Sequence, residues 1–120
     1  MNVESRKRAL RYMFERAVDP LGYKFSPDDE LVDFLLEQEV YLERKNGIPY
    51  CPCQGLPQDR EGRMKLVCPC IPFHRAQFDY MKCCWCLLYV HKDVTDTSGL
   101  RQIPVNEIPA DVLKRGQNVR

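Results

Sequence analysis

Seven cysteines, all between positions 51 and 86, constrain this 120-residue chain more than any other feature. Six of them form three Cys-x-Cys pairs, which are Cys51-Pro52-Cys53, Cys68-Pro69-Cys70 and Cys84-Trp85-Cys86. The seventh, Cys83, directly precedes the third pair. An odd number of cysteines excludes a complete set of internal disulfides. The cluster therefore indicates metal ligands, redox catalysts or both.

The remaining composition indicates which compartment and which partners to expect. The first ten residues carry charges but no apolar stretch, so they do not predict a secretory signal peptide. No run of 18 apolar residues occurs, so no membrane-spanning segment is predicted. Lys and Arg number 18 against 17 Asp and Glu, which argues against a general nucleic-acid-binding protein. We expect a cytoplasmic chain in a reducing compartment, where structural disulfides are rare.

Two helices are predicted before the cysteines. Apolar residues recur at helical spacing over residues 4–18, and Asp19-Pro20 ends the pattern. A second helix is predicted to begin with Ser26 as its N-cap and Pro27 in its first turn, and to end at Asn46-Gly47. The broad apolar stripe of this second helix comprises Leu31, Val32, Leu35, Leu36, Glu39 and Leu42.

Residues 48–86 cannot form long regular elements, because prolines and glycines interrupt them. Within this region, residues 73–82 lack both and predict a short helix. The apolar run at residues 87–90 is expected to pack into the core. The tail is turn-rich, with a short helix predicted at residues 110–114.

The spacing of the cysteine pairs differs from that of a zinc ribbon, which uses Cys-x-x-Cys knuckles. In extended backbone, the two side chains of a Cys-x-Cys pair point to opposite sides, and proline favours this geometry. Each pair can give one sulfur to a metal centre and the other to a different task, or wrap both around an object larger than one ion. An iron–sulfur cube is such an object and takes four thiolates. Four ligands out of six paired cysteines would leave one dithiol–disulfide couple.

These pairs resemble those of the catalytic subunit of ferredoxin:thioredoxin reductase. The similarity also includes Gly47-Ile48-Pro49-Tyr50 before the first pair and the apolar residues 87–90 after the last, and it is good over residues 46–90. The resemblance implies a mainly α fold: one small domain with irregular Pro/Cys-rich loops organised around an iron–sulfur cluster. Residues 1–47 would form a helical scaffold, residues 48–90 the cluster and active-site disulfide, and residues 91–120 the tail.

The resemblance also implies an activity, which is reduction of protein disulfides. Reduced ferredoxin would deliver electrons one at a time through one 4Fe–4S cluster, and thioredoxin or a similar protein disulfide would accept them. The implied cluster ligands are Cys51, Cys68, Cys70 and Cys84.

The same resemblance implies that Cys53 and Cys86 form the redox-active disulfide. Cys53 would attack the target disulfide and Cys86 would resolve the mixed disulfide. Partners would be ferredoxin and thioredoxin, with no nucleic acid and no membrane, and a second subunit or a homodimer stays open. Basic residues that flank the implied ligands are expected to dock an acidic ferredoxin: Arg60, Arg63, Lys65, Arg75 and Lys82.

Three departures from the plant-type pattern suggest a non-plant relative. The loop at residues 71–83 is longer, Trp85 replaces a histidine, and Cys83 is an additional thiol. Trp85 cannot act as an acid or base near neutral pH, and we expect it to shield the cluster from water. His74 and His91 are expected to be structural.

Two alternatives belong to other classes. One is a structural zinc-binding interaction module, which elemental analysis for iron and zinc would separate from an iron–sulfur protein. The other is a simple iron–sulfur electron carrier, which a thiol count before and after mild reduction would test.

Overall fold

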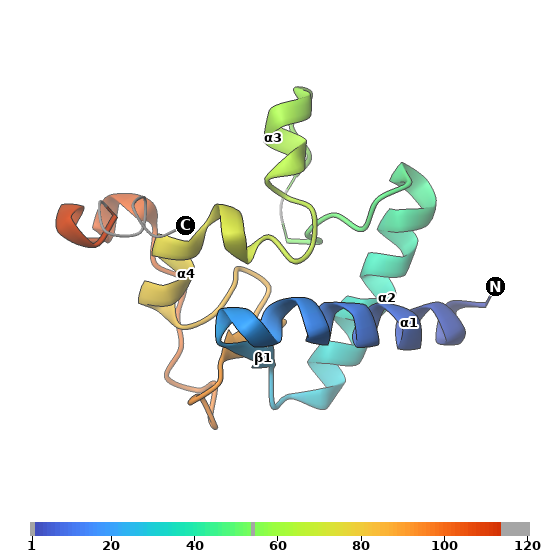
Figure 1. Cartoon of the computed structure of the whole chain (residues 1–120), viewed down its shortest axis with the longest axis horizontal. Coiled ribbons are helices and arrows are strands. Elements are labelled where there is room, and N and C mark those ends of the chain that lie inside the picture. The colour runs from blue at the N-terminus through green and yellow to red at the C-terminus, as the bar shows by residue number, and fades with distance from the viewer. Residues whose placement is uncertain (1, 54, 114–120) are drawn as a thin grey trace.

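Two long helices that pack across each other form the base of the fold in a computed structural model that describes residues 2–53 and 55–113 (Figure 1). Along the chain, with η for a 3-10 helix, the elements are α1 (Val3–Val18), η1 (Asp19–Leu21), β1 (Tyr23–Phe25), α2 (Asp29–Asn46), α3 (Arg60–Met64), η2 (Ile71–Phe73), α4 (Arg75–Met81), β2 (Tyr89–His91) and η3 (Val105–Glu107). The expected fold class, a small and mainly α-helical single domain, is confirmed.

Helix α1 follows its predicted range closely. Its N-cap is Asn2, whose side-chain oxygen accepts a hydrogen bond from the Ser5 N–H at 2.7 Å. The residues that it buries recur every three or four positions, as expected for one face of a helix: Lys7, Leu10, Phe14 and Val18. Two ion pairs attach this face to α2, between Arg6 and Glu43 at 2.6 Å and between Lys7 and Asp33 at 2.9 Å.

Helix α2 ends as predicted but begins two residues later than the predicted cap allows. Its C-cap, Gly47, adopts a φ of 80°, and its N–H donates to the Glu43 carbonyl at 2.7 Å. The predicted N-cap, Ser26, is wrong. Asp28 caps the helix instead, because its carboxylate accepts the Leu31 N–H, while the Ser26 hydroxyl accepts the N–H of Asp28 itself.

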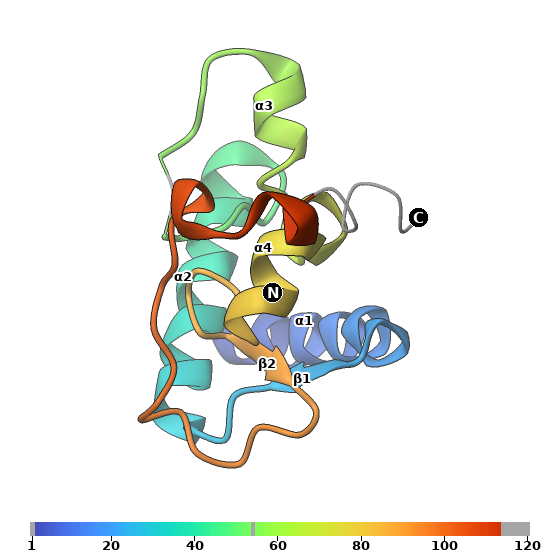
Figure 2. The ribbon, with the colours of Figure 1, turned by 90° about the vertical axis from the view of Figure 1, so that its left-hand side faces the viewer.

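A two-stranded antiparallel sheet, which the sequence did not predict, joins the start of the chain to the end of the cysteine segment. Strands β1 and β2 lie side by side (Figure 2), with Tyr23 opposite His91 and Phe25 opposite Tyr89. Each strand has only three residues, too few for an alternating pattern to be recognised. The sheet places the Tyr89 side chain against Phe14 of α1, with ring centroids 6.4 Å apart, and its hydroxyl beside the Cys68 sulfur.

Helix α4 confirms the short helix predicted at residues 73–82, within two residues. Asp79 on this helix accepts a hydrogen bond from the Tyr23 hydroxyl at 2.6 Å and pairs with Arg75 and His91. Arg75 also donates to the Leu21 carbonyl at 2.8 Å. These contacts attach α4 to the sheet and to the turn after α1.

The apolar run at residues 87–90 packs into the core as expected, since Leu88, Tyr89 and Val90 are buried. Residues 110–113 are helical, as predicted for the tail, and Lys114 lies outside the described residues. Among the described residues, no helix combines the length and the apolar character needed to cross a bilayer.

One buried cluster unites α1, α2, the sheet and α4. Six of the seven cysteines belong to this core: Cys51, Cys68, Cys70, Cys83, Cys84 and Cys86. The cysteine segment is thus packed into the interior of the fold instead of lying on it as a separate surface module.

Candidate metal and disulfide centre

The first two cysteine pairs lie side by side because their backbones pair. Tyr50 and Val67 form an antiparallel bridge. On either side of this bridge, the Cys51 N–H donates to the Leu66 carbonyl at 2.7 Å and the Cys68 N–H donates to the Pro49 carbonyl at 2.9 Å. The pairing of residues 49–51 with residues 66–68 therefore places Cys51 and Cys68 next to each other.

The third pair lies in a turn that leads directly into β2. The Leu87 N–H donates to the Cys84 carbonyl at 3.2 Å, and Leu87 itself has a φ of 61°, in the left-handed region. The Cys84 N–H donates to the Tyr89 carbonyl at 3.1 Å, which closes the turn. The sheet register thereby determines where Cys84 and Cys86 lie.

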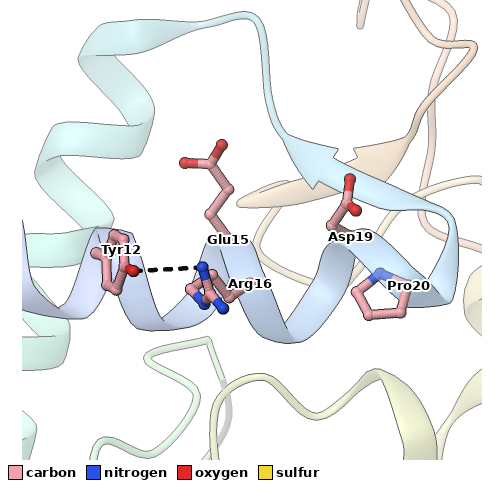
Figure 3. Close-up of a pocket in the computed structure, with 5 residues that line it drawn as sticks. All are labelled: Tyr12, Glu15, Arg16, Asp19 and Pro20. Atoms are coloured by element: carbon pink, nitrogen blue, oxygen red, sulfur yellow. Dashed lines mark hydrogen bonds between the residues drawn. The ribbon is translucent and has the colours of Figure 1, made fainter.

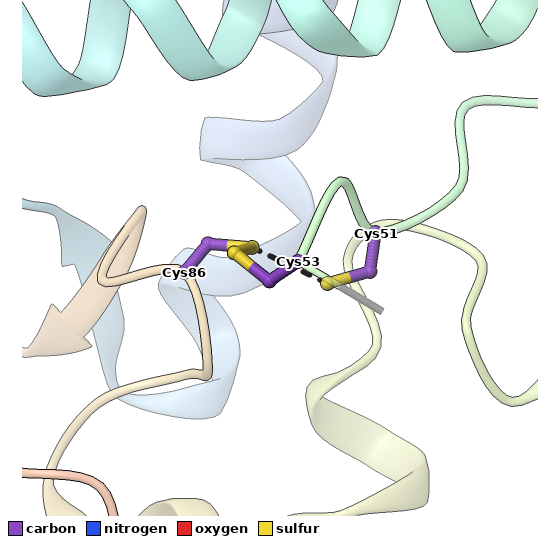
Figure 4. Close-up of side chains that lie close together, drawn as sticks. All are labelled: Cys51, Cys53 and Cys86. Carbon is purple, nitrogen blue, oxygen red and sulfur yellow. Dashed lines mark hydrogen bonds between the residues drawn. A yellow bond between two sulfur atoms is a disulfide. The ribbon is translucent and has the colours of Figure 1, made fainter. Parts of the chain in front are cut away.

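Cys53 and Cys86 form a disulfide, with their Cα atoms 5.7 Å apart, a separation common for such bonds (Figure 4). Cys53 is exposed, whereas Cys86 is only 9% exposed. The Cys51 sulfur lies 3.3 Å from the Cys86 sulfur, and the sulfurs of Cys51, Cys53 and Cys86 all lie within 4.8 Å of one another. The disulfide thus has one accessible sulfur and one that touches a buried thiol.

The other thiols of the implied ligand set lie around Cys51. A hydrogen bond with Cys51 is the main cause that raises the pKa of Cys70, followed by burial and by the thiols of Cys84 and Cys68. Burial raises the pKa of Cys84 to about 11 and that of Cys68 well above its usual value. The structure therefore brings Cys51, Cys68, Cys70 and Cys84 close enough to act on one another electrostatically.

Two of these sulfurs form hydrogen bonds with a single residue of β2. The Tyr89 hydroxyl lies 3.2 Å from the Cys68 sulfur, and the Tyr89 N–H donates to the Cys84 sulfur at 3.3 Å. Sulfurs that hold iron typically accept such bonds, which help set the reduction potential of the metal centre. Sequence reasoning missed this role of Tyr89, because the partners of a tyrosine hydroxyl depend on long-range contacts.

Cys83 differs from the other thiols. It is 0% exposed, forms a bridge with Val90, and belongs to the apolar core. Burial alone raises its pKa to about 11, whereas the neighbouring thiols also act on one another. Its surroundings are those of a packed cysteine that behaves as a small hydrophobe.

The Trp85 ring packs against the ring of His74 in a tilted arrangement, with ring centroids 4.4 Å apart. It also packs edge to face against Phe78, with ring centroids 5.0 Å apart. The His74 Nε2–H donates to the Lys65 carbonyl at 2.9 Å, and burial lowers the pKa of His74. This aromatic group lies beside the third cysteine pair, since Trp85 is its middle residue, and Cys84 and Cys86 on either side of it are buried.

The donor set fits an iron–sulfur group better than a hard cation. It consists of soft sulfur atoms in an apolar interior, where unbound thiols hold their protons and only a bound metal would stabilise thiolates. Both carboxyl oxygens of Glu39, a buried residue of α2 near Cys68, are without a hydrogen-bond partner in the described part of the chain. Such an orphaned polar group next to the sulfurs fits a site that holds a polar occupant.

Two surface hollows differ in how near they lie to the cysteines. One is formed by α1 and η1 and lies away from the cysteines, with Arg16 donating to the Tyr12 hydroxyl at 3.3 Å (Figure 3). A second adjoins the first cysteine pair, and its lining combines basic and apolar side chains: Ile48, Tyr50, Gln58, Arg60, Arg63, Met64 and Val67. Tyr50 in this lining directly precedes Cys51 in the chain.

Comparison with known proteins agrees with this geometry. No curated protein matches the chain significantly. A family model does, over residues 2–111, and it describes the ferredoxin thioredoxin reductase catalytic beta chain. The match extends from α1 to the tail and so includes both helices of the base, the sheet and all seven cysteines. The chain therefore belongs to the family of ferredoxin thioredoxin reductase catalytic beta chains.

Proposed function

We propose that this protein reduces protein disulfides with electrons from ferredoxin, passed through one 4Fe–4S cluster to the Cys53–Cys86 disulfide. The observation that carries the proposal is the asymmetric disulfide. Its outer sulfur, on Cys53, is accessible to a partner protein, while its inner sulfur, on Cys86, lies 3.3 Å from Cys51, one of the cysteines that would hold the cluster.

Four buried cysteines would hold the cluster: Cys51, Cys68, Cys70 and Cys84. When bound, a 4Fe–4S cluster supplies electrons one at a time to a disulfide that needs two. The chain itself keeps water away from the inner sulfurs through Trp85 and the core residues around them. Tyr89 orients Cys68 and Cys84 through its two hydrogen bonds.

The reduced couple would then act by thiol–disulfide exchange. The Cys53 thiolate attacks one sulfur of the target disulfide, forms a mixed disulfide and releases one target thiolate. The Cys86 thiolate next attacks the Cys53 sulfur, releases the second target thiolate and restores the Cys53–Cys86 disulfide. Each cycle therefore moves two electrons from the couple to the target.

The basic residues on and after α3 support a docking face for an acidic electron donor. Arg60 and Lys65 are exposed, and Arg60 and Arg63 line the hollow beside the first cysteine pair. Two other predicted docking residues are less suited, because Arg75 pairs with Asp79 and Lys82 lies 3.7 Å from Asp93. We place the donor face at α3.

A cytoplasmic location is part of the proposal. Five cysteines are outside the disulfide, and reducing compartments keep such thiols reduced. Thioredoxin or a similar disulfide protein is the proposed acceptor, in line with the family to which the chain belongs.

A single metal ion is the alternative occupant. The three sulfurs of Cys51, Cys53 and Cys86 are close enough to bind one zinc ion, but only after the disulfide is reduced. A simple electron carrier would require no disulfide, and Cys53 would then have no role.

Iron and acid-labile sulfide in anaerobically purified protein test the proposal. We expect about four of each per chain, as one 4Fe–4S cluster requires, together with reduction of thioredoxin that depends on reduced ferredoxin. Zinc in place of iron, or a cluster whose protein reduces no disulfide, would contradict it.

A further inference from the structure

Tyr89 is a buried tyrosine whose hydroxyl has a sulfur atom as its hydrogen-bond partner. The residue is 2% exposed, and its hydroxyl lies 3.2 Å from the Cys68 sulfur. Its ring packs edge to face against Phe14, with centroids 6.4 Å apart, and in a tilted arrangement against Phe25, with centroids 5.5 Å apart. A buried hydroxyl that water cannot reach needs a partner within the protein. The two aromatic contacts therefore hold the Tyr89 hydroxyl at Cys68.

The backbone of the same residue is attached to a second implied ligand. The Tyr89 N–H donates to the Cys84 sulfur at 3.3 Å, and the Cys84 N–H donates to the Tyr89 carbonyl at 3.1 Å. In the sheet, Phe25 lies opposite Tyr89. The Ser26 N–H donates to the Leu88 carbonyl at 2.9 Å, which extends this pairing by one residue. Both the turn and the sheet thus fix the backbone from which the hydroxyl projects.

Metal binding would determine the direction of the hydrogen bond between Tyr89 and Cys68. Between a phenol and a free thiol, either group can donate. A cysteine sulfur that binds iron is a thiolate, which has no proton and can only accept. A tyrosine hydroxyl ordinarily keeps its proton near neutral pH. The Tyr89 hydroxyl would then be the donor, and a donor directed at a ligand sulfur stabilises the more negative, reduced state of a cluster.

We propose that Tyr89 is a positioning residue that raises the reduction potential of the iron–sulfur group, with its hydroxyl donating to the Cys68 sulfur. The inference rests on the proposed function, because it requires a cluster held by the cysteines. A higher potential makes the cluster easier for an electron donor to reduce. It also makes the onward transfer of that electron to the Cys53–Cys86 disulfide less favourable, so Tyr89 would balance the two steps.

The first test is Tyr89→Phe, examined by redox titration of the cluster-loaded protein with electron paramagnetic resonance or visible absorbance as the readout. The substitution removes the hydroxyl but keeps the ring and the N–H that donates to Cys84. Hydrogen bonds to charged groups are the strong ones. We therefore expect the ratio of reduced to oxidised cluster at a fixed potential to fall about tenfold, which is a midpoint about 59 mV lower for one electron.

A second variant should move the potential in the opposite direction. Incorporation of 3-fluorotyrosine at position 89 keeps the ring, the hydroxyl and the packing but makes the hydroxyl more acidic and so a stronger donor. At a pH low enough for the phenol to keep its proton, the midpoint potential should rise. Loss of packing would not produce this rise, and the variant tests the inference even if Tyr89→Phe retains no iron.

A matched control lies on the neighbouring strand. Tyr23 is also a buried tyrosine, but its hydroxyl donates to Asp79 at 2.6 Å and not to a sulfur. Tyr23→Phe should lower the thermal stability and leave the midpoint potential unchanged. This control separates a general loss of stability from the loss of a donor to sulfur.

The outcomes separate the inference from the function on which it rests. A wild-type potential in Tyr89→Phe would refute the inference, and so would an equal fall in Tyr23→Phe. An unchanged or lower potential with 3-fluorotyrosine would also refute it. In each of these cases, protein that still reduces thioredoxin with electrons from ferredoxin would leave the proposed function intact. Wild-type protein that binds no iron would refute the proposed function itself.

Discussion

Replacing Cys86 by serine is the most direct test of the two roles within the disulfide. The substitution leaves Cys53 as an unpaired, accessible thiol and removes the group that would resolve a mixed disulfide. We expect Cys86→Ser to capture an oxidised thioredoxin, or a small aromatic disulfide, as a stable mixed disulfide through Cys53. Cys53→Ser should capture neither, because its remaining thiol at Cys86 is buried.

The expected lifetime of the captured species follows from the geometry. In the wild type, the Cα atoms of the two cysteines are 5.7 Å apart, so Cys86 can reach the Cys53 sulfur without rearrangement of the backbone. Well-oriented intramolecular groups reach effective concentrations far above 1 M, so even about 1 M exceeds 1 mM of external thiol by about 10³-fold. The mixed disulfide of Cys86→Ser should therefore last about 10³-fold longer than that of the wild type in 1 mM thiol.

Non-reducing electrophoresis and intact-mass measurement after timed quenching give the lifetime and the stoichiometry. One target per chain, lost on addition of strong reductant, is the expected result for Cys86→Ser. The assignment of the attacking sulfur is wrong if Cys53→Ser traps the target or if alkylation of reduced wild-type protein labels Cys86 first. Equal lifetimes in wild type and Cys86→Ser would refute the resolving role.

Three further perturbations test other parts of the structure. Replacement by serine of any one of the four implied ligands should abolish the bound iron measured by elemental analysis, because the segment around them has little regular structure of its own. These ligands are Cys51, Cys68, Cys70 and Cys84. Reversal of charge at Arg60 and Lys65 should slow ferredoxin-dependent reduction several-fold at low salt, with the difference disappearing at high salt. Tyr23→Phe removes the hydrogen bond to Asp79 and should lower the free energy of unfolding by about 1.5 kcal/mol, seen as a thermal midpoint about 5 °C lower.

Each of these has a control elsewhere in the chain. Cys83→Ala should retain full iron, since Cys83 packs in the core apart from the interacting thiols. Arg8→Glu changes an exposed charge on α1 and should not affect the rate with ferredoxin. Tyr12→Phe removes an exposed hydroxyl and should leave the thermal midpoint unchanged. Full iron in Cys68→Ser, a salt-independent rate after charge reversal, or equal midpoints for the two tyrosine variants would contradict the respective argument.

Local signals explain why the helices could be predicted and the sheet could not. Helix α1 shows its apolar period over many residues, and Gly47 marks the end of α2 by a conformation that few other residues adopt. The start of α2 was ambiguous because Ser26 and Asp28 are both good caps, and only the folded chain shows which oxygen meets an unpaired N–H. Strands β1 and β2 are short and far apart in sequence, so their pairing depends on the whole fold.

The candidate site, like the fold, could be predicted from the sequence only in part. The spacing of the cysteines, together with the resemblance, identified which residues to examine and suggested the pairing of Cys53 with Cys86. The surroundings of the sulfurs could not be read from the sequence, because the hydroxyl of Tyr89 reaches Cys68 from β2, which is distant from it in the chain. Glu39 fell on the apolar stripe of its helix, and a carboxylate at such a position is the signal that could have directed attention to it.

The turn from Cys84 to Tyr89 also limits how the chain can change in length. Tyr89 serves two sulfurs at once and is aligned by its pairing with Phe25. Because side chains alternate along a strand, one residue inserted or deleted between Cys84 and Tyr89 would turn the hydroxyl to the opposite face of the sheet. The segment that contains α4 lies outside this turn, so a change in its length would not shift this register, although Asp79 and Arg75 attach α4 to the rest of the fold. The interval from Cys84 to Tyr89, by contrast, must keep its length for Tyr89 to reach both sulfurs.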